Sequence, residues 1–154
     1  MSELRVPTVA LAAEVLCGDG RSILGRIFLP AAASTHPGPM RAEEWANDPA
    51  TFFPFLPDDS ASPVLLNKRE VLVVSVPADA DEPSELESTS VVEQRAIVEC
   101  GGRTIEGSIH NDLREGQGRV LDYMNRPEPF LSLRDGKRRH LIQKRRISRV
   151  VEVD

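Results

Sequence analysis

The side chains best suited to chemistry are three histidines and two cysteines, and their spacing points to no catalytic or metal site. His36, His110 and His140 lie far apart in the chain and match no zinc-ligand spacing. Cys17 and Cys100 form no CxxC motif, and neither has a nearby histidine that would suggest a nucleophile pair. We therefore predict no metal site, and we expect both cysteines to be free thiols with a structural role.

Two Arg–carboxylate pairs are the next candidates. Arg41 precedes Glu44, and Arg119 precedes Asp122, each by three residues. This spacing places the two side chains on one face of a helical turn, where a local ion pair is the usual outcome. A single carboxylate with no second titratable partner is a poor acid–base set. The prediction is that the protein is not an enzyme.

Glycine-rich turns resemble a phosphate-binding loop only superficially. The stretch "CGDGRSILG" (17–25) has no Lys-Ser/Thr ending and is not followed by a helical pattern. Tight hairpin turns explain these glycines, and no cofactor is expected.

The stretch 134–149, "RDGKRRHLIQKRRISR", holds eight bases and one acid. Such a density can bind the phosphates of nucleic acid, but it also occurs on solvated strand faces, and the aromatic residues of a base-stacking surface are missing. Nucleic acid, and RNA in particular, is thus a possible partner. The candidate binding residues are Arg138, Arg139, Lys144, Arg145, Arg146 and Arg149.

An internal repeat governs the organisation of the chain. "RAEEWANDPATFFPF" (41–55) aligns without a gap to "RVLDYMNRPEPFLSL" (119–133), and the flanking stretches also match. The corresponding residues are Arg41 and Arg119, Glu44 and Asp122, Trp45 and Tyr123, Asn47 and Asn125, Pro49 and Pro127, and Phe52 and Phe130.

The repeat divides the chain into three parts. We predict a first unit over 1–77 with a long Pro-rich loop, an acidic linker over 78–94 and a second unit over 95–154. The linker has six acids and no base, whereas the second unit has 13 bases against 9 acids within a chain of net charge -5. The chain therefore combines a neutral-to-acidic half with a basic half.

Alternating apolar and polar residues predict strand hairpins over 12–28 and 94–110. The repeated motif then predicts one helical turn, which Asn47 or Asn125 would end in the left-handed conformation. Phe52 and Phe130 are expected to begin a core-facing strand, followed by two short strands bent at a basic pair. The predicted fold class is mainly β, with two tandem small barrels of about five strands and one short helical turn each.

This order of elements resembles SH3-like and Sm-like small barrels. It carries a G-R-x-I-x-G-x-I hairpin, an acidic turn, an F-x-x-L strand and a closing [KN]-[KR]-x-I-x-x-V strand. It is also similar to an uncharacterised bacterial group of single-barrel proteins with an R-L-x-D-x-L-N motif. The Asp-x-x-x-Asn RNA-contact pattern of Sm proteins is not cleanly present in either copy, and the helix lies between the second and third strands. Ring assembly and uridine binding are therefore not carried over.

No apolar stretch approaches the length of a membrane span, and the N-terminus resembles no leader, so we expect a cytoplasmic protein without membrane association. The favoured function is a non-enzymatic protein-interaction, scaffold or regulatory module. It would bind a protein partner or self-associate through exposed strand edges. Nucleic-acid binding through the basic second barrel is the alternative.

Overall fold

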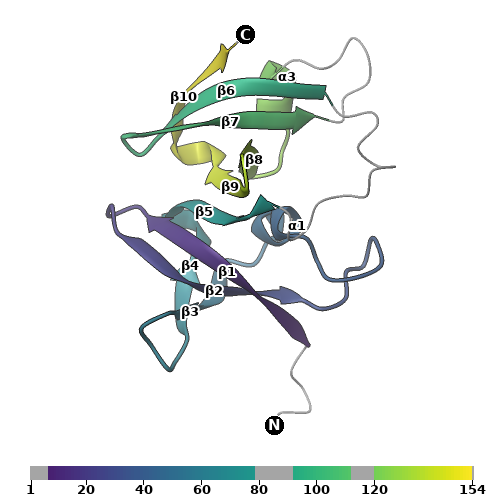
Figure 1. The fold of residues 1–154 in the computed structure, drawn as a ribbon, viewed down its shortest axis with the longest axis vertical. Helices are drawn as coiled ribbons and strands as arrows, with labels where there is room; N and C mark the ends of the chain where they lie inside the picture. Colours follow the sequence, from purple (N-terminus) through teal and green to yellow (C-terminus); the bar gives the residue numbers. More distant parts are fainter. Residues whose placement is uncertain (1–6, 79–91, 112–119, 154) are drawn as a thin grey trace.

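The computed structural model describes residues 7–78, 92–111 and 120–153. These residues form a mainly β protein in which the same order of elements occurs twice (Figure 1). The first half contains β1 (Thr8–Cys17), β2 (Ser22–Pro30), α1 (Ala42–Asn47), β3 (Phe52–Pro57), β4 (Val64–Asn67), the 3-10 helix η2 (Lys68–Glu70) and β5 (Val71–Pro77). The second half contains β6 (Val92–Cys100), β7 (Arg103–Asn111), α3 (Val120–Met124), β8 (Phe130–Asp135), β9 (Arg138–Gln143), the 3-10 helix η4 (Lys144–Arg146) and β10 (Ile147–Val153).

The ten strands form one antiparallel sheet in the order β10-β6-β7-β8-β9-β5-β1-β2-β3-β4. Two separate tandem barrels are not confirmed, because no pairing among the described strands closes either half. In each half a three-residue 3-10 helix turns the chain, so that β5 pairs with β1 rather than β4, and β10 pairs with β6 rather than β9. The outer side of β5 then pairs with β9 of the other half.

Strand registers match between the halves. Cys17 lies opposite Val71 and Cys100 opposite Ile147, and in each case a bulge follows one residue along the closing strand. A shift of 76 residues relates the two closing strands, since Val74 lies opposite Val15 and Val150 opposite Val98. Residues 76 apart can therefore be compared as counterparts over β4–β5 and β9–β10, and residues 78 apart over α1–β3 and α3–β8.

Gly25 shows why the hairpin carries a glycine at this point. A Cβ built there would lie 2.3 Å from the carbonyl oxygen of Leu56, and one on its counterpart Gly107 would lie 2.5 Å from that of Arg134. These contacts are too close for any side chain, so the glycine lets the third strand of each half cross tightly over the second.

Three predicted details need correction. No non-glycine residue in the described part of the chain has a positive φ, so neither Asn47 nor Asn125 ends its helix in the left-handed conformation. Phe130 is buried as predicted, but Phe52 is 55% exposed. The predicted linker 78–94 is too long at its end, because β6 already begins at Val92; residues 79–91 lie outside the described part.

Candidate interaction surface

The repeated motif builds the same small structure in both halves. Trp45 and Tyr123 are its buried aromatic residues, and Trp45 packs edge-on against Phe53 with ring centroids 4.9 Å apart. Burial raises the pKa of the Tyr123 hydroxyl well above its usual range, so this side chain stays neutral. The aromatic position is thus a packing site, as its exchange between Trp and Tyr suggests.

In each half, a lysine of the 3-10 helix donates hydrogen bonds to carbonyl oxygens at the end of the α-helix. Lys68 Nζ donates to the carbonyl oxygens of Trp45 (2.8 Å) and Asp48 (3.0 Å). Its counterpart Lys144 donates to those of Tyr123 (3.4 Å) and Arg126 (3.2 Å). Each ammonium thus adds a charged donor to backbone carbonyl oxygens at the end of the short helix. Burial lowers the pKa of both lysines.

Glu44 caps the start of α1. Its carboxylate accepts a hydrogen bond from the backbone N–H of Arg41 (2.9 Å) and another from the Thr35 hydroxyl (3.0 Å), and it pairs with His36. The Pro37 carbonyl and then Glu44 raise the pKa of His36. The second predicted pair is not described, because Arg119 lies outside the described residues.

The two halves meet where β9 pairs with β5, with Leu141 opposite Val74. Side chains of the second half enter the core of the first half at this junction: Phe130 and Leu141, which are 4% and 0% exposed, belong to the cluster that contains Trp45 and Ala46. The Asn47 side chain, at the end of α1, accepts a hydrogen bond from the backbone N–H of Phe130 (2.9 Å). The groove between α1 and β5 is therefore filled by β8 and β9.

Gln143 adds polar contacts to the junction. Its side-chain amide donates to the carbonyl oxygens of Lys68 (2.9 Å), Arg69 (3.2 Å) and Val71 (2.6 Å) across the boundary between the halves. Buried hydrogen bonds of this kind fix the register of the strand pair as well as stabilising it. The first half likewise contributes Leu16, Leu72 and Val73 to the core cluster of the second half.

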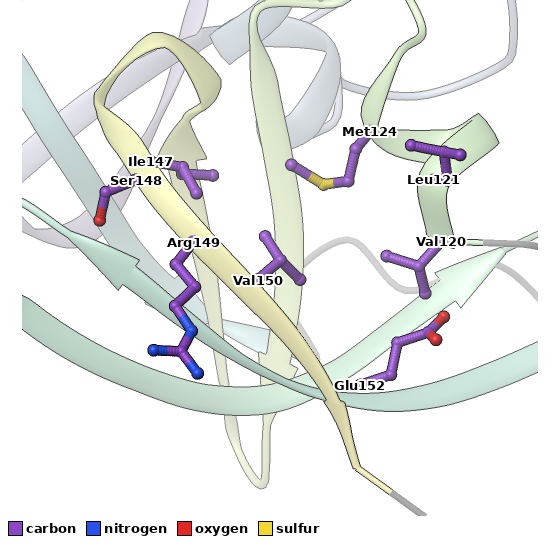
Figure 2. A pocket seen from close by; sticks show the side chains of 8 residues that line it. All are labelled: Val120, Leu121, Met124, Ile147, Ser148, Arg149, Val150 and Glu152. Atoms are coloured by element: carbon purple, nitrogen blue, oxygen red, sulfur yellow. The ribbon is translucent and has the colours of Figure 1, made fainter.

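The equivalent groove of the second half is open to solvent (Figure 2). It lies between α3 and β10 and has a volume of about 480 Å³. Val120, Leu121 and Met124 line it from the helix. The strand contributes the apolar Ile147 and Val150 and, beside them, Ser148, Arg149 and Glu152. Leu121 is 60% exposed, and β10 pairs on one side only among the described strands. The site thus combines an apolar groove with a strand edge.

The opposite end of the sheet exposes a second apolar surface. In the described part of the chain β4 also pairs on one side only, and Phe52, Val64 and Leu65 are exposed along β3 and β4. Leu65 is the most exposed of the three, at 71%. Exposed large apolar residues gathered on one strand edge are typical of interaction surfaces rather than of a solvated edge.

The predicted basic residues do not form one site. Arg138 and Arg139 lie at the start of β9, whereas Lys144, Arg145 and Arg146 follow its end. At ~3.3 Å per residue, the strand places about 17 Å between the two groups. β9 is a central strand rather than an edge, and Arg149 lies on the edge strand β10. Several of the six also have partners of their own. Arg138 lies 3.4 Å from Glu14, Arg146 3.8 Å from Glu70 and Arg149 4.0 Å from Glu99. Lys144 donates to a carbonyl oxygen just after α3.

Ser75 and His140 form a contact that the sequence analysis missed. They lie opposite each other on β5 and β9, and Ser75 Oγ is 2.6 Å from His140 Nδ1. Burial and then the nearby Arg138 lower the pKa of His140, which keeps the imidazole neutral. Ser75 itself is buried, so the contact gives its hydroxyl a polar partner inside the junction.

No group of three or more potential metal ligands occurs among the described residues. Within the same residues, no helix is long and apolar enough to cross a membrane. No family model, curated protein or solved structure matches the chain. The candidate surface therefore rests on its own geometry.

Proposed function

We propose that this protein is a non-enzymatic protein-interaction module built by internal duplication of a small SH3-like or Sm-like barrel unit. The observation that carries the proposal is the open groove between α3 and β10, with its apolar lining and adjoining strand edge. An extended partner segment added to β10 would gain main-chain hydrogen bonds from the edge and side-chain specificity from the groove.

Nucleic-acid binding is the weaker alternative. Its support was the basic density of 134–149, but Arg138, Arg146 and Arg149 each have a carboxylate within 4.0 Å and Lys144 is committed to carbonyl oxygens. The charges are also divided between the two ends of β9. This arrangement does not favour a continuous track for a phosphate backbone.

Capture from an extract of the source cell, after nuclease treatment, tests the proposal. Three baits are compared: the natural chain, Leu121→Asp in the groove, and Leu24→Glu as a control. Leu24 is 58% exposed, against 60% for Leu121, and its counterpart on β7 is the acidic residue Glu106. Proteins retained by the natural chain and by the control but lost with Leu121→Asp would support the proposal. Retention that is equal for all three baits, or that is seen only when the nuclease is omitted, would contradict it.

A further inference from the structure

We infer that the partner for the α3–β10 groove is the β3–β4 edge of a second copy of this chain, so that copies join head to tail. The inference rests on the proposed interaction function and makes it specific. Its evidence is that one chain already contains this contact once, between its own halves. In addition β10 and β4, at opposite ends of the sheet, each pair on one side only among the described strands (Figure 1).

The internal junction serves as the template. In it β9 pairs with β5, and Phe130 and Leu141 enter the core beside α1. The counterpart of β5 is the edge strand β10, and the counterpart of β9 is the edge strand β4. Applied between two chains, the internal register places Leu65 opposite Val150, as Leu141 lies opposite Val74.

The side chains at the free edge match those at the junction. Phe52 is the counterpart of Phe130, and Leu65 is the counterpart of Leu141. Phe52 and Leu65 are 55% and 71% exposed, whereas the residues that they correspond to are buried at the junction. The same side-chain types are thus presented at the same strand positions, without a surface to cover them in a single copy.

The groove is suited to receive them. On its helix side Val120 and Met124 take the positions of Ala42 and Ala46, which belong to the junction core, and Leu121 takes that of Glu43. On its strand side Glu152 takes the position of Val76. Met124 occupies more room than Ala46, but its flexible side chain can move aside for an aromatic ring. Asn125, which directly follows Met124 and is exposed, takes the position of Asn47, whose side chain accepts the backbone N–H of Phe130.

The contact joins two different surfaces, so it is heterologous and propagates into a ring or a filament rather than a two-fold dimer. This property gives a sharp test. Leu65→Asp removes the inserted edge but leaves the groove. Met124→Asp blocks the groove but leaves the edge, because Met124 takes the position of Ala46, which is buried with Phe130 and Leu141 in the junction. Each variant alone should be monomeric, whereas an equimolar mixture should form a one-to-one dimer and stop there.

Sedimentation velocity is measured on the natural chain, both variants, their mixture and the Leu24→Glu control, from about 1 to about 200 µM, which brackets micromolar association. Concentration-dependent assembly is expected for the natural chain and the control. Each variant should weaken it by about 30-fold or more, as expected for a central apolar contact. Circular dichroism checks that the variants are folded, and Leu65→Asn and Met124→Gln replace any variant that is not.

A natural chain that stays monomeric throughout, or assembly that survives Met124→Asp, would overturn the inference. Assembly that is lost in Leu65→Asp but not restored by mixing would also overturn it, because it would indicate an edge-to-edge dimer. If the chain is monomeric but a different protein is captured through the groove, the inference fails while the proposed function stands.

Discussion

Truncating Leu141 to alanine should destabilise the protein far more than truncating its counterpart Leu65. Leu141 is 0% exposed in the core at the junction between the halves, and Leu65 is 71% exposed at the free edge of β4. A fully buried Leu→Ala change costs about 2.7–5 kcal/mol, which includes the cavity left behind. An exposed one away from special features costs less than about 0.5 kcal/mol.

Urea unfolding followed by the fluorescence of Trp45 is a suitable assay, because the chain has one tryptophan and it lies in the same cluster as Leu141. With a urea slope of about 2 kcal/mol/M, Leu141→Ala should lower the midpoint by about 1.4–2.5 M and Leu65→Ala by less than ~0.25 M. Both are measured at about 1 µM, where micromolar self-association adds little.

Equal midpoint shifts for the two variants would refute the reasoning. That result would mean that β9 does not fill the first half's groove in solution and that the halves behave as separate units. A shift below about 0.5 kcal/mol for Leu141→Ala alone would refute it in the same way, because a collapsed cavity cannot account for so small a loss.

Lys68→Met should cost about 2–3 kcal/mol in urea unfolding, since it keeps the buried stem but removes the charged donor to two helix-end carbonyls. Gly25→Ala should cost about 1–3 kcal/mol or more in the same assay, because the new Cβ would meet the Leu56 carbonyl oxygen at 2.3 Å. His140 gives a pH dependence: its folded pKa lies below the ordinary value, so its stabilising contribution is complete above about pH 6.5 and decreases as the pH falls below that value. Measuring the free energy of unfolding of the natural chain and of His140→Asn at several pH values isolates the contribution of His140. If the two stabilities change with pH in the same way, the prediction is wrong.

The sequence carried enough information for the elements but not for their closure. Alternation predicted both long hairpins, and the Arg-to-Phe motif predicted a helical turn in each half. Whether a five-stranded unit closes on itself depends on which edge offers the better partner, and no local pattern records that choice. Here β5 pairs with β9 of the other half, so the strands of both predicted units belong to one open sheet.

The sequence does not reveal the interaction surface, for a related reason. Phe52 and Phe130 occupy the same position of the same motif, and only the presence of a neighbouring α1–β5 groove buries one of them. The one available signal was the replacement of Glu43 by Leu121, an apolar residue on a helix face that is polar in the other copy. The basic stretch is conspicuous in the sequence, but the sequence does not show that Glu14, Glu70 and Glu99 lie beside three of its arginines.

The differences between the filled junction and its free counterpart indicate how the two contacts should differ in strength. The internal contact is formed within one chain, so it benefits from a high effective concentration that separate chains do not have. It is also reinforced by Gln143, whose amide reaches three carbonyl oxygens, whereas the counterpart Asn67 is one methylene shorter and already accepts the backbone N–H of Arg69 (2.9 Å). A second copy would therefore bind through similar apolar side chains with fewer polar contacts. That combination gives a permanent junction inside each chain and a reversible, concentration-dependent one between chains.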